Sequence, residues 1–153
     1  MTTSDLFDDN PGAASCETQF RQFGGRRSFS GPIATVRCHE DNVLLRAQVS
    51  APGEGRVLVV DGGASFGCAL LGDTIAELAV SNGWAGIVVN GCVRDVVALA
   101  ELPIGIKALG TNPRPSGKGG AGEIDVTVTF GGAEFAPGAV LHADDDGVIV
   151  LAP

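Results

Sequence analysis

Three charged residues are spaced so that they could form one reaction site. Twenty residues separate Asp73 from the adjacent pair Arg94 and Asp95, which gives the pattern D-x20-R-D. In a helix followed by a strand, this spacing can return the start of the helix to the end of the strand, so that two carboxylates and a guanidinium share one small volume. The spacing also fits a surface Arg-Asp pair with Asp73 as an ordinary helix N-cap. From spacing alone, this simpler interpretation is the one to prefer.

If the three residues do meet, their chemistry suits a small oxo-acid. The first N–H groups of a helix that starts here, those of Asp73, Thr74 and Ile75, have no partner within the helix and favour an anion. Arg94 can bind a carboxylate through two parallel hydrogen bonds. Asp95 can hold a hard cation such as Mg2+, which keeps several waters and needs only one or two protein carboxylates. Such a site would bind the acid and polarise its carbonyl.

The surrounding pattern predicts the elements that would position these residues. A helix is expected over residues 71–82 and a buried strand over residues 84–90, just before Arg94. The other expected strands cover residues 32–38, 56–61, 104–109 and 123–130, and a hairpin covers residues 139–151 with the D-G step setting its turn. The other expected helices cover residues 3–9 (capped by Thr3 or Ser4), about 42–50, and 96–102. Residues 22–31 are expected to be loop. The sum predicts a single α/β domain with layered sheets and helices on one side.

Composition excludes several classes of function. The chain has 153 residues, a net charge of −8, 5% aromatic residues and no Tyr. An acidic chain with one adjacent basic pair, Arg26 and Arg27, repels phosphate backbones, so direct nucleic-acid binding is not expected. The acidic amino terminus lacks the apolar segment of a signal peptide, and no apolar run is long enough to span a membrane. We expect a cytoplasmic protein whose four cysteines, which form no C-x-x-C motif, are free thiols.

Two glycine-rich stretches and one acidic stretch resemble ligand motifs but lack essential positions. In residues 61–67 the glycines do not follow G-x-G-x-x-G, so a dinucleotide or S-adenosylmethionine site is disfavoured and a tight turn is expected. In residues 111–122 the lysine is not followed by Ser or Thr, so a P-loop is excluded. A mobile loop, serving as lid or subunit contact, is expected there, with Arg114 and Lys118 as possible anion contacts. The triple Asp at residues 144–146 lacks the ligand spacing of a calcium loop.

Five stretches of the sequence match the pattern of a known family. They are F-G-G-R at residues 23–26, S-F-x-G at 28–31, T-V-x-C-x-E-D-N at 35–42, G-R-V-L-V-V-D-G-G at 55–63 and V-T-F-G-G at 128–132. On these residues the chain resembles, over nearly its whole length, the RraA family, named for the regulator of ribonuclease activity A. The same superfamily includes the class II 4-hydroxy-4-methyl-2-oxoglutarate aldolases, which also decarboxylate oxaloacetate.

The resemblance implies a swivelling β/β/α-type fold and a ring-shaped homotrimer with clefts between subunits. It also implies roles for individual residues. Arg94 corresponds to the substrate-binding arginine, and Asp95 to the aspartate that binds a divalent cation, Mg2+ or Mn2+. The residues that correspond to the loop and helix start receiving the substrate are Gly72, Asp73, Thr74 and Ile75. The dedicated aldolases are longer than this chain, with a C-terminal segment that can complete a neighbour's site, so metal or pyruvate binding is expected more than efficient aldol cleavage.

Two functions follow as hypotheses. The first is a metal-dependent pyruvate lyase: the cation on Asp95 chelates a small 2-oxo acid, Arg94 holds the same oxygens, and cleavage yields a stabilised enolate. Oxaloacetate decarboxylation needs no further base, whereas aldol cleavage needs one, for which a metal-bound water oriented by Asp73 is the candidate. The rival is a non-catalytic inhibitor of an RNase E-type endonuclease, whose basic RNA-binding segments an acidic surface could occupy. A quinone methyltransferase lacks a cofactor motif.

Overall fold

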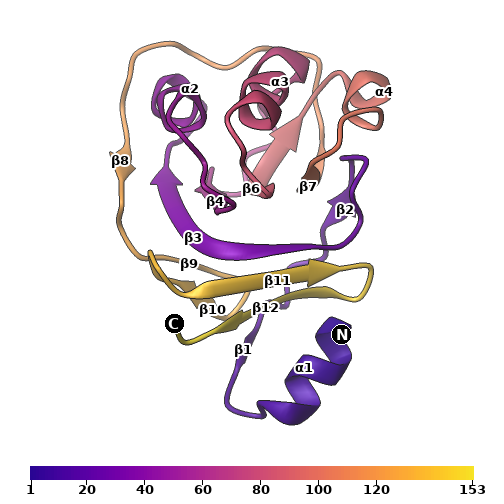
Figure 1. Ribbon diagram of the computed structural model, residues 1–153. Helices are drawn as coiled ribbons and strands as arrows, with labels where there is room; N and C mark the ends of the chain where they lie inside the picture. The colour runs from indigo at the N-terminus through magenta and orange to yellow at the C-terminus, as the bar shows by residue number, and fades with distance from the viewer.

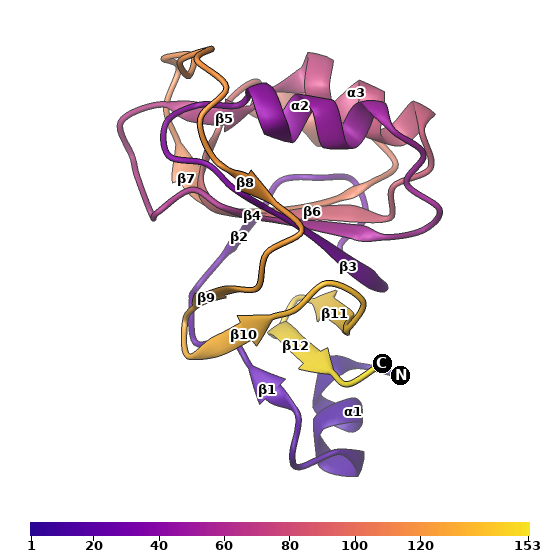
Figure 2. The ribbon, with the colours of Figure 1, turned by 90° about the vertical axis from the view of Figure 1, so that its left-hand side faces the viewer.

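The computed structural model describes residues 1–153 and arranges them in layers (Figures 1 and 2). Three helices cover one face of a mostly parallel block of strands, and a second, antiparallel group of strands lies against the opposite face. The first helix stands apart and packs on the antiparallel group. The elements are α1 (Thr3–Asp9), β1 (Ala14–Ser15), β2 (Arg21–Gln22), β3 (Phe29–Arg37), α2 (Val43–Ser50), β4 (Val57–Asp61), β5 (Ala69–Leu71), α3 (Asp73–Ser81), β6 (Gly86–Val93), α4 (Val96–Leu99), β7 (Gly105–Thr111), β8 (Glu123–Ile124), β9 (Val128–Phe130), β10 (Ala133–Phe135), β11 (Val140–Asp144) and β12 (Gly147–Leu151).

The strand β3 connects the parallel and antiparallel groups. Along the main sheet the strands follow the order β1-β12-β11-β3-β4-β6-β7-β2. The first half of β3 pairs antiparallel with β11, up to Pro32 opposite Val140, and its second half pairs parallel with β4, from Ile33 opposite Val57. The parallel strands β3, β4, β6 and β7 therefore end at one edge, and α2, α3 and α4 follow β3, β5 and β6. This edge is where an α/β sheet presents its ligand sites.

Side chains of the parallel strands alternate between two hydrophobic cores. In β4, Leu58 and Val60 belong to the core under the helices, which also contains Leu45 of α2 and Ala76 of α3. The alternate valines of β4, Val57 and Val59, belong to the core between the two groups of strands, with Phe135 and Leu141. Because residues along a strand point alternately to its two faces, a strand covered on both sides must be apolar throughout. This explains the continuous run V-L-V-V in β4.

The aromatic ring of Phe29 packs in a space that exists because β6 and β7 each begin with a glycine. A Cβ atom at Gly86 or Gly105 would overlap this ring. Phe29 is 7% exposed and belongs to the core between the strand groups. The glycines at the start of β6 and β7 thus leave the space in which the ring packs.

The structure confirms the layered α/β architecture and shifts several boundaries. The helix expected from residue 71 begins at Asp73, because Leu71 is still in β5, which pairs with β6. The cap of α1 is Thr2, one residue before the expected Thr3 or Ser4, and it forms a capping box with Asp5. The segment 22–31, expected to be loop, includes the end of β2 and the start of β3. Both strands run into this glycine-rich segment because neighbouring strands supply backbone partners.

The strand expected over residues 123–130 is wrong as one element. It is divided into β8, which pairs with β3, and β9, which pairs with β10. Between them Asp125 has a left-handed backbone, with φ of 57°. The alternation of apolar residues continues across this break, which is why sequence periodicity did not reveal it. The hairpin over residues 139–151 is confirmed, with a two-residue turn between Asp144 and Gly147.

No helix of this fold is both long and apolar enough to cross a membrane. All four cysteines are free, as expected from their spacing. Cys38, Cys68 and Cys92, hereafter the buried thiols, lie in the interior, whereas Cys16 is only partly buried. Burial raises the pKa of Cys38 to about 12 and also raises the pKa of Cys68 and Cys92.

Candidate functional site

Two neighbouring strands bring the expected site residues together at the carboxyl edge of the sheet. β5 runs parallel to the end of β6, with Leu71 opposite Val93, and the N–H of Arg94 donates to the carbonyl of Leu71 at 2.9 Å. The residues that follow the two strands, Gly72 and Asp73 on one side and Arg94 and Asp95 on the other, are therefore adjacent. The helix start and the strand end of the D-x20-R-D pattern do meet.

The carboxylate of Asp95 caps the helix α3. Its Oδ2 accepts a hydrogen bond from the N–H of Asp73 at 3.0 Å, whereas the N-cap residue, Gly72, has no side chain to do so. Asp95 itself has a left-handed backbone, with φ of 62°. A Cβ atom at Gly72 would lie 2.5 Å from Oδ2 of Asp95 and 3.3 Å from Cγ of Arg94. Gly72 therefore allows both charged side chains to approach the helix start.

This local geometry corrects one sequence-based expectation about the anion site. The N–H of Asp73 is not free, because Asp95 already accepts from it. The N–H groups of Thr74 and Ile75 donate to no acceptor within the chain, and the first intrahelical bond is the one from Ala76 to Gly72. Two backbone donors, rather than three, are therefore available at the positive end of α3.

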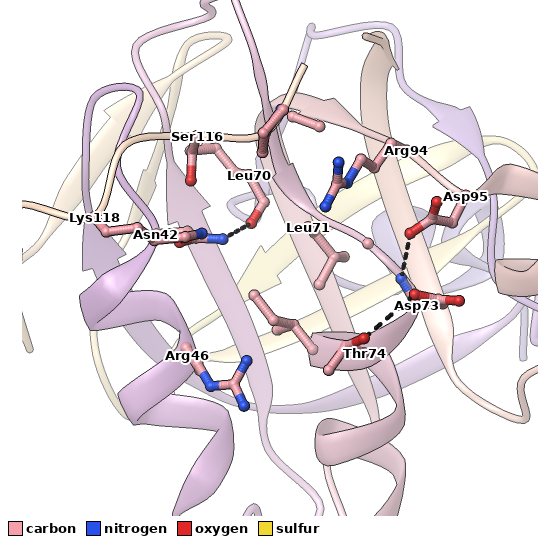
Figure 3. A pocket seen from close by; sticks show the side chains of 14 residues that line it. Asn42, Arg46, Leu70, Leu71, Asp73, Thr74, Arg94, Asp95, Ser116 and Lys118 are labelled. Carbon is pink, nitrogen blue, oxygen red and sulfur yellow. Dashed lines mark hydrogen bonds between the residues drawn. The ribbon is translucent and has the colours of Figure 1, made fainter. Parts of the chain in front are cut away.

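The six expected site residues line one cavity of about 190 Å3 (Figure 3). In Figure 3 the guanidinium of Arg94 projects into this space, while the Asp95 carboxylate lies beside the start of α3. The Arg94 Nη1 donates to the carbonyl of Pro113 at 3.3 Å, and no carboxylate lies within ion-pair distance of it. The volume is below the usual range for drug-sized ligands and fits a small acid better than a nucleotide.

Sequence reasoning missed the two residues that α2 and its N-cap contribute to the cavity wall, and it identified Lys118 only in part. Asn42 and Arg46 come from α2 and its N-cap, and Lys118 comes from the loop after β7. The Nδ2 of Asn42 donates to the carbonyl of Leu70 at 3.1 Å, and its Oδ1 accepts from Nζ of Lys118 at 2.6 Å. Lys118 was expected as a possible anion contact. Arg114, the other expected contact, does not line the cavity.

The loop that carries Lys118 is fastened to the rest of the site by Asp41. The Oδ2 of Asp41 accepts from the N–H groups of Gly119 and Gly120, at 2.5 and 3.0 Å, and its Oδ1 accepts from the N–H of Val43 at 3.1 Å. The Val43 N–H, opposed by burial, and then the two glycine N–H groups hold the pKa of the Asp41 carboxyl below its ordinary value. One carboxylate thus connects the start of α2 to the loop, because it accepts hydrogen bonds from both.

The cavity carries positive charge in an acidic protein. The chain forms two ion pairs, Arg27 with Asp145 and Arg37 with Glu123, and neither involves the cavity. Arg46, Arg94 and Lys118 therefore face this space without a carboxylate partner. Cations left unpaired around a cavity favour an anionic ligand.

The side chains present do not form a complete metal cage. No group of three or more His, Cys, Asp or Glu residues is arranged to hold a metal ion. Asp95 uses Oδ2 to cap α3, and its Oδ1 accepts no hydrogen bond within the chain. This donor set suits a Mg2+ or Mn2+ ion that takes one protein carboxylate and fills its other positions with water and ligand oxygens. It does not suit a structural zinc site.

The glycine-rich turn at residues 61–67 satisfies its own polar groups. The Oδ1 of Asp61 accepts from the N–H of Gly63 at 3.0 Å and from Nδ2 of Asn90 at 3.1 Å. Ser65 donates to Glu40, and its hydroxyl accepts from the N–H of Gly67. This agrees with the expected tight turn.

Comparison with known proteins adds a family to this geometry. The family model described as RraA-like, Aldolase/RraA, matches residues 3–150. A Geobacillus kaustophilus HTA426 protein described as S-adenosylmethionine:2-dimethylmenaquinone methyltransferase is 47% identical, with 99% of this chain and 95% of that chain covered and a TM-score of 0.98. The RNA-processing inhibitor RraA from Thermus thermophilus is 46% identical, with 99% and 92% covered and a TM-score of 0.97. Streptomyces coelicolor RraAS2, described as an unusual member of the RNase ES inhibitor RraA family, is 28% identical, with 99% and 80% covered and a TM-score of 0.82.

Proposed function

Because this chain belongs to the Aldolase/RraA family, we propose that its cationic cavity is the active site of a divalent-metal-dependent lyase that releases pyruvate from small 2-oxo acids. Oxaloacetate decarboxylation is the primary activity, and cleavage of 4-hydroxy-4-methyl-2-oxoglutarate is the second. The observation that carries this proposal is the pairing of an Arg94 guanidinium without a carboxylate partner and the Asp95 carboxylate at the mouth of one small cavity.

The chain's own residues bind and orient the acid. Arg94 grips the C1 carboxylate, for which its planar fork is suited. The free N–H groups of Thr74 and Ile75 offer further donors at the positive end of α3. Lys118 adds positive charge to the opposite wall, so a dianionic acid is drawn into the cavity. These contacts hold the 2-oxo acid in one orientation before its bond breaks.

Asp95 is the residue that would hold Mg2+ or Mn2+, through the oxygen that does not cap α3. A bound divalent cation supplies Lewis acidity, which stabilises negative charge that develops on the keto oxygen. In oxaloacetate the C3–C4 bond breaks, carbon dioxide leaves, and the electron pair remains on the pyruvate portion as an enolate. A proton from water at C3 then completes pyruvate. Asp73, at the mouth of the cavity, would orient the water that gives this proton. In aldol cleavage a water oriented by Asp73 would instead act as the base that takes the proton of the C4 hydroxyl, and the carbonyl product leaves as the C3–C4 bond breaks.

The test is pyruvate release from both acids, measured with and without EDTA. We expect EDTA to abolish release and added Mg2+ or Mn2+ to restore it. Arg94→Ala and Asp95→Ala should each lower the rate roughly a hundredfold or more, as removal of one transition-state contact typically does. Arg26→Ala is the matched control, because Arg26 is exposed and lies outside the cavity. Full rates in both site variants would end the proposal.

A second candidate function is inhibition of an RNase E-type endonuclease. It is favoured by the Thermus and Streptomyces relatives, both described as RNA-processing or RNase inhibitors, and by the net charge of −8, since an acidic surface can compete for basic segments. Pull-down with such an endonuclease at increasing salt is the test. Retention that is lost at high salt and does not change in Arg94→Ala or Asp95→Ala, together with no pyruvate release, would favour the inhibitor over the lyase.

We also propose that the chain assembles as a homotrimer, as the family resemblance implies. Size-exclusion chromatography with light scattering should give three times the chain mass. A monomeric mass would mean that no clefts form between subunits, but the cavity within each chain would be unchanged.

A further inference from the structure

The helix α1 is attached to the antiparallel strands by polar contacts at its start. The N–H and the hydroxyl of Thr3 donate to Asp144, at 2.8 and 2.6 Å, and the hydroxyl of Ser4 donates to Asp146 at 3.1 Å. A helix of seven residues is not stable alone in water, so α1 persists only while it is packed on the sheet. It lies on the side of the molecule away from α2, α3 and the proposed active site (Figure 1). Its docking can therefore change without altering that site.

His142 lies beneath this helix. In β11 the side chain of Ala143 points into the core between the two groups of strands, so those of His142 and Asp144 point to the outer face, where α1 packs. A cavity of about 150 Å3 lies there, and its wall includes Thr3 and Leu6 of α1 together with His142. The imidazole is half-buried and forms no hydrogen bond and no ion pair within the chain. It is the one titratable ring enclosed by α1.

The two charged groups in the wall of this cavity offer a protonated His142 no free partner. The Oδ2 of Asp144 already accepts from the Thr3 N–H, and its Oδ1 accepts from the Thr3 hydroxyl and from the N–H of Asp146 at 3.0 Å. The amino group of Met1 also belongs to the wall, and its positive charge opposes a second one on the imidazole.

The other charged side chains near the start of α1 have partners of their own. Arg27 pairs with Asp145 at 2.8 Å, and Asp5 accepts from the N–H of Thr2 at 3.2 Å. None of these side chains lines the cavity. A proton on His142 would therefore leave a half-buried charge unpaired for as long as α1 stays in place, which is unfavourable.

The direction of the pH effect follows from two side chains. Burial, and then the Met1 amino group, lower the pKa of His142, so neutral His142 favours the docked helix. Docking is then at full strength above the ordinary histidine pKa of about 6.5 and weakens as the pH falls below it. Burial opposes the effect at Asp144, but the hydrogen bonds from Thr3 keep its pKa below the ordinary value, so its contribution is lost only below about pH 4.

We propose that α1 is a pH-sensitive arm, which protonation of His142 releases from the outer face of the antiparallel strands. Between about pH 6.5 and pH 4 the imidazole is the trigger, and Asp144 continues to hold the helix start. Release uncovers Ile149 of β12, which is 5% exposed and shares a groove wall with Phe7 of α1. The inference does not depend on the proposed lyase activity.

The test is amide hydrogen exchange of the full-length protein between pH 7.5 and pH 5. The exchange rate of each segment is divided by that of an unfolded peptide of the same sequence at the same pH, which gives a protection factor free of the chemical pH dependence. Because α1 is helical only when docked, its protection reports docking. We expect the protection of α1 to fall by up to roughly tenfold for each pH unit below about 6.5, while that of α3 stays constant.

Three variants assign the effect to one side chain. His142→Gln and His142→Leu replace the imidazole by a polar and by an apolar side chain that cannot titrate, and α1 should then keep its protection from pH 7.5 to pH 5. His39→Gln is the matched control, because His39 is exposed and far from α1 in the chain, and the pH dependence of the wild type should remain.

Three results would overturn the inference. The first is protection of α1 that does not change between pH 7.5 and pH 5. The second is a loss of protection with falling pH that persists in both neutral variants of His142. The third is a parallel loss in α3, since acid would then be unfolding the whole molecule rather than releasing its first helix.

Discussion

Asp95 has one observed role and one proposed role, and substitutions can separate the two. One carboxylate oxygen caps α3 at 3.0 Å from the Asp73 nitrogen, and the other is the proposed ligand of the cation. Asp95→Asn keeps an oxygen for the cap and loses the charge. Asp95→Ala loses both, and it also places alanine at φ of 62°, where Asn is tolerated better. Asp95→Gly loses both functions without the backbone strain.

The expected magnitudes follow from these contacts. Loss of an N-cap costs about 1 kcal/mol, whereas loss of the charge alone at a helix start costs about 0.3–1 kcal/mol. A loss of about 1 kcal/mol lowers the Tm of a domain of this size by roughly 2–4 °C. We therefore expect Asp95→Ala to be the least stable, Asp95→Gly intermediate and Asp95→Asn closest to the wild type. α3 should persist in all three, because Ile75, Ala76 and Ala79 are buried beneath it.

The assay combines thermal unfolding with pyruvate release from oxaloacetate at graded Mg2+. Stability should follow the cap, whereas turnover should be lost in all three variants because each lacks the carboxylate. The reasoning is refuted if Asp95→Asn is as unstable as Asp95→Ala, since the Asp73 N–H would then not depend on this oxygen. Turnover retained in Asp95→Asn would show that the negative charge is not what holds the cation.

Three further predictions concern the surroundings of the cavity. Asp41→Asn should raise KM several-fold by loosening the loop that carries Lys118. Because folding lowers the pKa of Asp41, its ionised carboxylate stabilises the folded protein above its ordinary pKa, and this stabilisation is lost as the pH falls toward the folded value. The stability of the variant should therefore depend less on pH below about pH 4. Gly72→Ala should lower pyruvate release roughly a hundredfold by displacing Asp95 and Arg94, whereas Gly12→Ala, in open space, should not. The buried thiols should resist Ellman's reagent at neutral pH in the folded protein and react after unfolding; fast reaction of more than one thiol in the native state would contradict their burial.

The sequence could predict the part of the site whose residues lie within one helix–strand unit of the chain. Asp73 and Arg94 belong to one helix–strand unit, so their meeting follows from chain direction and spacing. The buried strands could be predicted for a similar reason, because a strand covered on both faces is apolar throughout. The layered α/β architecture followed from these strands and from the late hairpin.

The part that sequence could not predict depends on tertiary packing. Arg46 reaches the cavity only because α2 packs beside α3, and nothing in the spacing of the two helices states which faces meet. The cap of α3 is similar, since the Gly72 N-cap gives no sign that the carboxylate of Asp95, 22 residues after Asp73, will accept from the Asp73 N–H. The break at Asp125 was hidden because apolar residues alternate on both sides of it. Asn42 had one available signal, its place in the E-D-N stretch that carries the family resemblance.

The shared strand β3 has a consequence for how the molecule melts. Between Pro32 and Ile33 its pairing changes from β11 to β4, so the antiparallel and parallel groups of strands share this one strand. Neither group can come apart while the other keeps this strand intact. The two hydrophobic clusters should therefore be lost together, in one calorimetric peak whose van't Hoff enthalpy equals its measured enthalpy.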